Sequence, residues 1–366
     1  MTGINDSVFV IAEAGVNHNG DPDLAHQLVD AAAKAGANAI KFQTFDPVAL
    51  TTHDAPKAEY QGATIDREES QRDLLTGLRL PNDVFMDLQK HSTDAGIEFL
   101  STPFDRASLE FLSECVGLET IKIGSGDLTD GPLLFAAART GRKLIISTGM
   151  STIDEVAEAL DLVAYAQVRS KPPSCRAEFR DSRQQEDSAA RLGRTVTLLH
   201  CTSAYPAPED EVNLRAMATL DAAFPTPVGY SDHTAGIVVP IAAVAAGATV
   251  IEKHLTLDRD LPGPDHSASI EPAKFAEMVS AIRRVERAMG IPEKNIMPAE
   301  ADVRRVARKS LVAARSVKAG EVLSEDDLTM KRPGDGVSPM FFWDIIGSRA
   351  DTDLVPDQCV PVTQNK

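Results

Sequence analysis

Short runs of β-branched and other apolar residues alternate along the chain with segments in which apolar residues recur every three or four positions. The first apolar run, VFVIAEAG, covers residues 8–15, and the first amphipathic segment covers residues 21–36. In that segment Asp21 is suited to the N-cap, Pro22 to the first turn and Gly36 to the C-terminal end of a helix. The pattern therefore predicts a strand followed by a helix.

The same pattern repeats along the next 250 or so residues. Further strands are predicted at residues 38–45, 97–103, 119–126, 143–150, 195–201, 226–233 and 249–256, and further helices at 82–96, 106–115, 131–141, 152–167, 214–224, 237–247 and 271–290. Alternation of this kind predicts a parallel sheet covered by helices, and eight units within residues 1–290 fit a (β/α)₈ TIM barrel of the α/β class. A doubly wound open sheet is the alternative. The barrel is favoured because polar residues recur at the C-terminal ends of the strands, which converge on one mouth only in a barrel.

Two stretches interrupt the alternation. Residues 46–80 are polar and long for a connection, and residues 169–194 are charged and contain KPPS and DSRQQEDS. The second stretch has the composition of an insertion or loop. Because it follows the helix after the fifth strand, we expect it at the bottom of the barrel, away from the chemistry.

The pattern changes after residue 290. Residues 291–306 are polar and are interpreted as a linker, and residues 307–366 contain short strands with KAGE and KRPGDG turns. We therefore expect a small β-rich domain at the C-terminal end. Because about 60 residues can bury only a thin core, we expect this domain to pack against another protein surface.

Composition narrows the possible partners. The chain of 366 residues has a net charge of -17, which argues against binding to nucleic acid or to an anionic membrane surface. No apolar run reaches membrane-spanning length, and the start MTGINDSVFV does not have the pattern of a signal peptide. The four cysteines are scattered, which is typical of reduced thiols in a cytoplasmic protein.

Polar side chains stand at or just beyond the end of every predicted strand. They include Glu13, Asn17, Lys41, Gln43, Thr102, Lys122, Ser125, Ser147, Ser203, Ser231, His233, Glu252 and His254. Ionisable groups at the ends of buried strands need partners or a ligand. Their recurrence predicts a polar ligand in the mouth of the barrel.

His233 and His254 end the seventh and eighth strands. Neighbouring strands lie about 4.8 Å apart, so both imidazoles are expected to reach one ion. Two histidines with open coordination positions suit a divalent ion such as Mn²⁺, with Mg²⁺ or Co²⁺ as alternatives. The competing interpretation is a pair of hydrogen-bonded core histidines.

Lys41 and Lys122 are predicted to point into the barrel. Each is flanked by bulky residues of the opposite strand parity (Ile40 and Phe42 in the first case), which belong against the helices. With nearby hydroxyls and Gly-rich turns, the two lysines predict a cradle for phosphate and carboxylate groups. The alternative is that each lysine extends outward to solvent. Glu13 is a candidate acid or base, or else a structural partner of a lysine.

Several long motifs in this chain resemble the sialic acid synthase family, which includes N-acetylneuraminate, legionaminate and pseudaminate synthases. They are IAEAGVNHNG, KFQTF, STPFD, IKIGSGD, STGM, LLHCTSAYPAPEDEVNL, GYSDHTAG, IEKHLTLDRDLPGPDHSASIEP and KRPGDGVSP, and they occur in order along nearly the whole chain. The resemblance implies a TIM barrel followed by an antifreeze-like (SAF) domain.

The resemblance also implies a reaction. Carbon 3 of phosphoenolpyruvate attacks the aldehyde of an open-chain N-acetylated mannosamine, water adds to carbon 2, and phosphate leaves by C–O cleavage to give N-acetylneuraminate. A legionaminate synthase acting on 2,4-diacetamido-2,4,6-trideoxymannose is the alternative, and a pseudaminate synthase is less favoured on the motifs KAEYQ (residues 57–61) and HSASIEP (residues 266–272).

Roles follow from the resemblance residue by residue. The positions that match phosphoenolpyruvate ligands are Lys41, Thr102, Lys122, Ser125, Ser147 and Ser231. The metal ligands match His233 and His254, and the catalytic carboxylate matches Glu13. Contacts to the sugar or the phosphate match Ser203, Tyr205 and Asp265. Arg332 matches an arginine that the SAF domain of a partner subunit places over the sugar, which implies a domain-swapped homodimer. Ser203 and Asp127 depart from the Asn and Glu that relatives carry, which affects individual contacts and not the reaction class.

Two other functions remain open from the residues alone. One is a carbohydrate-binding barrel without catalysis. The other is an aldolase that forms a lysine Schiff base with free pyruvate.

Overall fold

The computed structural model describes residues 7–53, 55–56 and 70–361. The KAEYQ motif at residues 57–61 lies outside the described residues. The chain divides into two compact units, residues 1–290 and 291–366.

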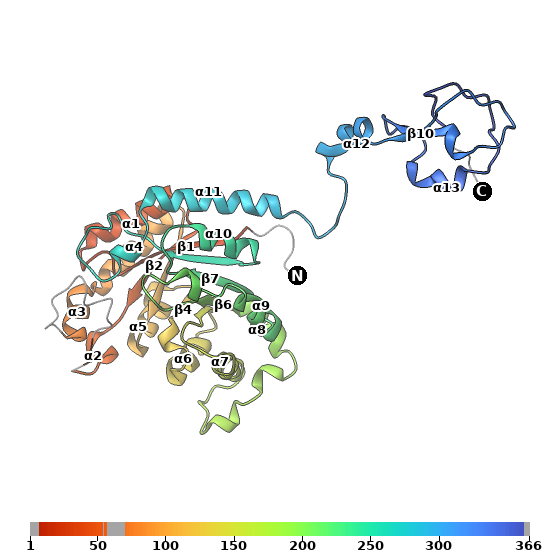
Figure 1. Cartoon of the computed structure of the whole chain (residues 1–366). Helices are drawn as coiled ribbons and strands as arrows, with labels where there is room; N and C mark the ends of the chain where they lie inside the picture. Colours follow the sequence, from red (N-terminus) through yellow and green to blue (C-terminus); the bar gives the residue numbers. More distant parts are fainter. Residues whose placement is uncertain (1–6, 54, 57–69, 362–366) are drawn as a thin grey trace. The chain divides into compact units, whose positions relative to one another are not determined.

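Eight parallel strands form the centre of the first unit. They are β1 (Phe9–Gly15), β2 (Ala39–Thr44), β3 (Glu98–Pro103), β4 (Thr120–Ile123), β5 (Lys143–Ser147), β6 (Val196–Cys201), β7 (Val228–Asp232) and β8 (Val250–His254). They are hydrogen-bonded in the order β3-β2-β1-β8-β7-β6-β5-β4, and β3 lies against β4, so the sheet curves into a nearly closed barrel (Figure 1). The predicted barrel is confirmed, and the open sheet is excluded.

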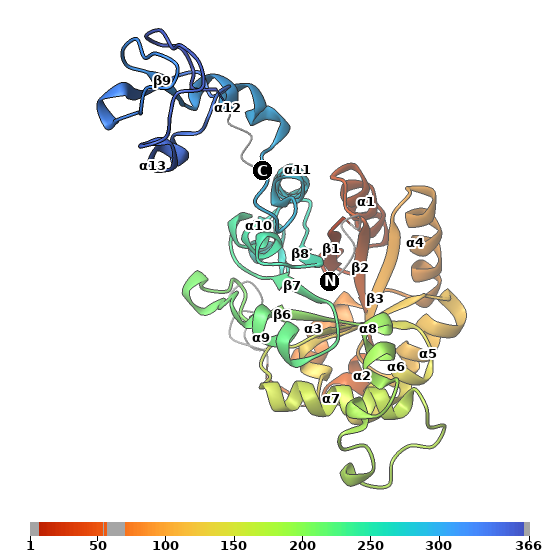
Figure 2. The same ribbon diagram turned by 90° about the vertical axis from the view of Figure 1, so that its right-hand side faces the viewer.

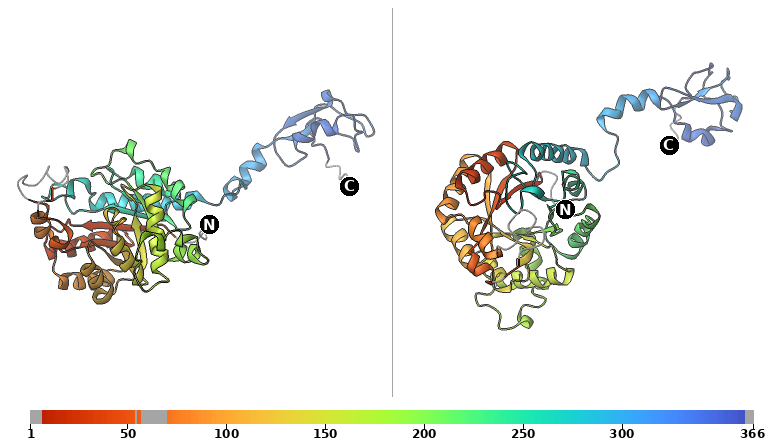
Figure 3. Two further views of the ribbon diagram at one scale, coloured as in Figure 1. Left: turned by 90° about the horizontal axis from the view of Figure 1, so that it is seen from below. Right: turned by 60° about the vertical axis from the view of Figure 1, so that its left-hand side comes forward.

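Helices surround these strands, as the right-hand view of Figure 3 shows. The main ones are α1 (Pro22–Lys34), α4 (Asn82–Asp94), α5 (Arg106–Glu110), α6 (Gly131–Arg139), α7 (Ile153–Ala166), α9 (Ala216–Ala223), α10 (Val238–Ala245) and α11 (Pro272–Met289). A π-helix, Phe111–Val116, continues α5, and in Figure 2 α1 and α4 lie side by side outside β2. The Asp21 side chain accepts hydrogen bonds from the backbone of Asp23 and Leu24, so the predicted start of the first helix is correct.

The core has two layers because successive side chains of a strand point to opposite faces. The larger layer, between strands and helices, contains Ile40, Phe42, Ile121 and Ile123. The smaller layer fills the barrel and consists of Ile11, Ala39, Leu100, Ile145, Leu199 and Val250, with Phe9 packed against it. Residues two positions further along these strands therefore point into the barrel mouth.

The described part of the polar stretch at residues 46–80 contains two short helices that the sequence pattern did not predict, α2 (Pro47–Leu50) and α3 (Gln71–Leu78). Ser70 and Asp73 form a capping box at the start of α3. Leu74 and Leu78 of α3 pack with Phe45 in a small apolar cluster. This i, i+4 leucine pair is the signal that the overall polarity of the stretch obscured.

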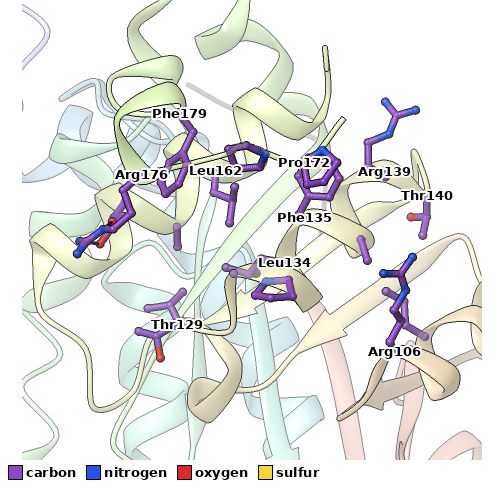
Figure 4. Close-up of a pocket in the computed structure, with 18 of the residues that line it drawn as sticks. Arg106, Thr129, Leu134, Phe135, Arg139, Thr140, Leu162, Pro172, Arg176 and Phe179 are labelled. Carbon is purple, nitrogen blue, oxygen red and sulfur yellow. Dashed lines mark hydrogen bonds and ion pairs between the residues drawn. The ribbon is translucent and has the colours of Figure 1, made fainter. Parts of the chain in front are cut away.

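The insertion at residues 169–194 is more ordered than its composition suggests. It contains two 3₁₀ turns, Arg176–Glu178 and Ser182–Gln184, and most of α8 (Ser188–Thr195), which packs against β5 and β6. It connects the end of α7 to the start of β6, and its residues 170–179 lie along α6 and α7 on the outer side of the barrel (Figure 1 and Figure 4).

The second unit is small and rich in loops. β9 (Ser310–Ala313) pairs antiparallel with β10 (Leu328–Lys331), isolated bridges add three more strand contacts, and α13 spans Phe342–Ile345. Its core consists of a few residues, among them Leu311, Leu323 and Leu354. The end of the expected linker is helical, since α12 spans Ala301–Ala307. Within the described residues, no helix combines the length and the apolarity needed to cross a membrane.

Candidate active site

Polar side chains converge at the C-terminal ends of the barrel strands. The buried polar side chains at this end of the barrel include Glu13, Lys41, Thr102, Lys122, Ser147, Ser231, His233, Glu252, His254 and Asp265. On their strands, Glu13, Lys41, Thr102, Ser147 and Glu252 each follow by two positions a residue of the barrel-filling layer. Strand alternation therefore explains why ionisable groups occupy apparently internal strands.

Two lysines and two carboxylates form one charge cluster. Lys41 Nζ lies 2.6 Å from Glu13 Oε2 and 3.7 Å from Glu252 Oε2, and Lys122 Nζ lies 3.7 Å from Glu252 Oε1. Hydroxyl groups of neighbouring strands form hydrogen bonds with this charge cluster. Lys41 donates to Thr102 at 3.1 Å, Lys122 donates to Ser147 at 2.7 Å, and the Ser231 hydroxyl donates to Glu252 at 2.9 Å.

The two carboxyl groups respond differently to burial. Burial raises the pKa of Glu13 to about 7, against the opposing attraction of Lys41. Burial also acts to raise the pKa of Glu252, but Lys122 and Lys41 together outweigh it and hold that pKa below its usual range. Glu252 is therefore the stable counter-charge for both ammonium groups, and Glu13 is able to gain or lose a proton near neutral pH.

The lysines also differ. Burial acts to lower the pKa of Lys41, but Glu13 and Glu252 outweigh it and raise the pKa. For Lys122, burial outweighs the attraction of Glu252 and lowers the pKa. Lys122 is thus the cation with less compensation, and an anionic ligand would stabilise its charge.

The two histidines lie together, with ring centroids 5.4 Å apart. His233 Nδ1 donates to the Thr202 carbonyl at 2.7 Å, which leaves Nε2 as the acceptor nitrogen. Burial lowers the pKa of His233 and lowers that of His254 strongly, so both imidazoles are neutral at pH 7. Neutral imidazole is the form that binds metal ions.

The surroundings of the histidines fit a metal ion. His254 Nδ1 is buried without a hydrogen-bond partner among the described residues, and Asp265 Oδ2 lies 4.0 Å from it. The Tyr205 ring packs 4.2 Å from the His233 ring, centroid to centroid. No group of three His, Cys, Asp or Glu side chains poised to hold an ion occurs within the described parts of the chain. If an ion is held by the two imidazoles alone, coordination positions would be left for substrate or solvent.

An ion pair on the opposite face of the same strands supports these histidines. Lys253 Nζ lies 2.6 Å from Asp232 Oδ2 with both side chains inaccessible to solvent, and the Tyr230 hydroxyl donates to Asp232 at 3.0 Å. Asp232 and Lys253 are paired in the β7–β8 register and directly precede His233 and His254. The pair thus fixes the two strand ends that carry the imidazoles.

The remaining predicted residues lie at the rim of the cluster. Gln43 donates to Glu13 at 3.3 Å, and the Asn17 amide donates to the Leu255 carbonyl at 2.9 Å. Ser125 and Ser203 meet at Gly149, where an added Cβ would lie 2.8 Å and 2.4 Å from their hydroxyl oxygens. Only glycine leaves room for these hydroxyls at that position.

Arg332 is the one predicted site residue outside the barrel unit. It is exposed, directly after β10 in the second unit. Sequence reasoning assigned no role to Glu252, although its place between Val250 and His254 in the strand alternation identifies it as inward-facing. It also missed Cys201, whose sulfur lies 3.2 Å from the Ser125 hydroxyl oxygen.

The barrel fold and this mouth define a TIM-barrel enzyme whose candidate site brings two buried ammonium groups close to a pair of neutral imidazoles. The NeuB family model matches residues 28–294, and the SAF domain model matches residues 308–361. The chain belongs to the NeuB family and carries a SAF domain.

Relatives agree over nearly the whole chain. The N,N'-diacetyllegionaminic acid synthase of Campylobacter jejuni is 42% identical over 96% of this chain and 98% of its own length. The human N-acetylneuraminate-9-phosphate synthase is 34% identical over 96% of this chain and 91% of its own length. The crystal structure of N-acetylneuraminic acid synthetase from Leptospira borgpetersenii has a TM-score of 0.66 and 34% identity, covering 82% of this chain and 90% of that chain.

Proposed function

We propose that this protein condenses phosphoenolpyruvate with an N-acetylated mannosamine-type sugar to give a nine-carbon 2-keto sugar acid and phosphate. It is an enzyme of the nonulosonic acid synthase type, as its relatives are. One observation carries the assignment: two buried lysines, each with a hydroxyl neighbour, face the same space as two neutral imidazoles. A trianionic substrate beside an aldehyde needs this combination of charges and ligands.

The cluster suggests a role for each group. Lys41 and Lys122, with Thr102, Ser125, Ser147 and Ser231, bind the phosphate and carboxylate of phosphoenolpyruvate. Glu13, with its pKa near 7, accepts or donates the proton at the aldehyde oxygen or at the attacking water. Asn17, Gln43, Ser203, Tyr205 and Asp265 contact the sugar or the phosphate.

His233 and His254 are proposed to hold a divalent ion, with Mn²⁺ as the first candidate and Mg²⁺ or Co²⁺ as alternatives. The donor set fits, since both imidazoles are neutral and Asp265 lies close to His254. When bound, such an ion supplies Lewis-acid polarisation of the aldehyde.

For the acceptor sugar we favour 2,4-diacetamido-2,4,6-trideoxymannose, which gives N,N'-diacetyllegionaminate. The support is the higher identity to a legionaminic acid synthase, 42%, than to the human N-acetylneuraminate-9-phosphate synthase, 34%. N-acetylmannosamine, the first expectation from the sequence, remains the second candidate because the same reaction class serves both sugars. A pseudaminate-type sugar is the least favoured.

A domain-swapped homodimer is proposed to complete the site with Arg332 of a partner subunit. The second unit exposes Met340, Phe341 and Trp343 by 78%, 54% and 74%, and such apolar side chains suit contact with another subunit. A cytoplasmic location is also proposed, and the four unpaired cysteines fit a reducing compartment.

The test is phosphate release from phosphoenolpyruvate with each sugar in the presence of Mn²⁺. We expect the highest kcat/KM with the diacetamido sugar and loss of activity in His254→Ala and after chelation. Absence of phosphate release with every acylated aminohexose would favour a binding barrel without catalysis. Borohydride trapping of free pyruvate on a lysine, without metal dependence, would favour the Schiff-base aldolase.

A further inference from the structure

His266 is a fully buried histidine beside the mouth that none of the proposed roles uses. It directly follows Asp265 in the loop after β8 and begins a short 3₁₀ turn, His266–Ala268. Its Nε2 donates to Asn19 Oδ1 at 3.1 Å, in the loop after β1, and its Nδ1 lies 2.7 Å from the Thr256 hydroxyl oxygen. Because β1 and β8 are neighbours in the barrel, the ring joins the two loops that follow them.

The partners of His266 fix which ring nitrogen carries the hydrogen. The Asn19 side chain donates from Nδ2 to the Pro262 carbonyl at 2.8 Å, so its Oδ1 is left to accept from the ring. Nε2 is therefore the donor, and Nδ1 accepts from the Thr256 hydroxyl. Burial lowers the pKa of His266, so this neutral ring is the form present at pH 7.

Gly263 shows how closely the ring and Asn19 approach each other. A Cβ added at this glycine would lie 2.6 Å from His266 Cδ2 and 2.7 Å from Asn19 Oδ1. Any side chain at position 263 would force one of these groups to move. The contact is therefore built into both loops and is not an accidental approach of two surface side chains.

The loop that contains His266 also carries Asp265 into the mouth. The Asp265 carbonyl accepts hydrogen bonds from the Ser269 backbone N–H at 3.1 Å and from the Ser269 hydroxyl at 2.6 Å. The Asn17 amide, from the loop after β1, donates to the Ser269 hydroxyl oxygen at 2.8 Å. These contacts act on the backbone of Asp265, so the conformation of the loop decides where its carboxylate lies.

The Asp265 carboxylate lies on the imidazole side of the mouth. Its Oδ2 is 4.0 Å from His254 Nδ1, and a Cβ added to Gly15 would lie 3.7 Å from that Oδ2 and 3.2 Å from Glu13 Oε1. All of these groups belong to β1, β8 or the loops after them, whereas Lys122 is on β4, which lies opposite β8 in the closed strand order. Asp265 therefore faces the space proposed for the sugar aldehyde.

We propose that His266 is a positioning residue for Asp265. By joining the loops after β1 and β8, it holds the Asp265 carboxylate at the place where a hydroxyl group of the acceptor sugar binds. The ring is inaccessible to solvent and substrate, so it acts only through Asp265. Displacing such a group by about 1 Å is enough to lower the rate by about 10²-fold. This role rests on the proposed function, in which Asp265 contacts the sugar.

Two variants remove the contact from its two sides. His266→Ala deletes the ring, and Asn19→Gly deletes its acceptor while tolerating the left-handed backbone of that residue, whose φ is 51°. Each should lower kcat/KM for the sugar by roughly ten- to hundredfold and leave the Kd of phosphoenolpyruvate, measured by calorimetry without sugar, within about twofold. His91→Ala is the matched control and should change neither value, because His91 lies on α4 and contacts Asp30.

A double-mutant cycle separates positioning from general stability of the loop. Because His266 acts through Asp265, His266→Ala in an Asp265→Ala background should change kcat/KM for the sugar by less than about twofold. A full additional loss in that background would overturn the proposal. A parallel loss of phosphoenolpyruvate affinity in both His266→Ala and Asn19→Gly would also overturn it, because the whole mouth would then be disturbed. Asn19→Gly carries the same test when His266→Ala does not fold.

A crystal structure of His266→Ala gives a measurement that does not require activity. We expect the Asp265 carboxylate to move away from His254, and an unmoved carboxylate would overturn the proposal. Absence of phosphate release by the wild type with every acylated aminohexose would refute the proposed function instead. A displaced Asp265 would then still support the positioning role.

Discussion

Glu13 and Glu252 have the same side chain, but their different positions in the charge cluster move their pKa values in opposite directions. Both are buried and both contact Lys41, but Glu252 also faces Lys122 and accepts the Ser231 hydroxyl. The pKa of Glu13 is therefore raised and that of Glu252 lowered. A pair of carboxyl groups whose pKa values are moved in opposite directions is typical of sites that transfer protons.

Lys122 is expected to contribute strongly to phosphoenolpyruvate binding. Lys122→Gln should lower kcat/KM for phosphoenolpyruvate by roughly two to three orders of magnitude, because a buried cation would no longer face the substrate phosphate and Glu252 would lose a partner. Lys143→Gln, at the exposed start of β5, is the matched control and should stay within about twofold. Steady-state kinetics test this, and an unchanged kcat/KM for Lys122→Gln would show that Lys122 does not bind phosphoenolpyruvate.

The raised pKa of Glu13 predicts a pH dependence of stability. The folded state holds this proton up to about pH 7, whereas an ordinary glutamate loses it near 4.5. Between these values the folded state binds more protons, so the free energy of unfolding falls as pH rises, by at most about 3 kcal/mol. Thermal unfolding at pH 5 and pH 8 should show a larger fall in the wild type than in Glu13→Gln, which keeps the contribution of Asp127 and Asp265, whose pKa values are also raised. A constant difference between the two proteins at both pH values would contradict it.

At the scale of elements, β7 and β8 carry chemistry on one face and structural charge on the other. The Asp232–Lys253 pair lies against the helices, and His233 and His254 lie in the mouth. Sequence alternation alone did not reveal this pair, because its identification requires the register between two strands that only the folded sheet supplies.

Breaking this pair should destabilise the barrel. Lys253→Met leaves the Asp232 carboxylate buried without its cation, which costs about 3–5 kcal/mol and lowers the melting temperature by roughly 10 °C. Asp232→Asn combined with Lys253→Met should recover part of the loss, since no uncompensated charge remains. Calorimetry checks both proteins. A melting temperature of Lys253→Met equal to that of the wild type would show that the pair does not stabilise the fold.

Most of the elements could be predicted because apolar alternation and helix caps are local signals. Asp21 and Thr152 cap the helices that their sequences indicate, and the inward direction of Lys41 followed from its apolar neighbours. Helix α3 has local signals too, its Ser70 cap and its leucine pair, but the polarity of the surrounding stretch obscured them. The order within the insertion could not be predicted in this way, because it depends on a partner outside the insertion, Asp161 for Arg183.

At the scale of the whole molecule, Arg332 and the barrel site are separated into two compact units. If the proposed domain-swapped dimer forms, mixed subunits should complement one another. When inactive His254→Ala and Arg332→Ala chains are dissociated and reassociated together, half of the dimers are mixed, and one site of each mixed dimer has both residues intact. Phosphate release should return to roughly a quarter of the wild-type rate. No recovery, with mixed dimers demonstrated by mass spectrometry, would contradict the swap.

The proposed reaction in the mouth of this barrel joins phosphoenolpyruvate to a sugar aldehyde with cleavage of the C–O bond. Phosphoenolpyruvate labelled with ¹⁸O in the bridging position tests this most directly, in the presence of 2,4-diacetamido-2,4,6-trideoxymannose and Mn²⁺. We expect the released phosphate to contain the label and its release to require the sugar. Unlabelled phosphate, or no release with any acylated aminohexose, would exclude this reaction.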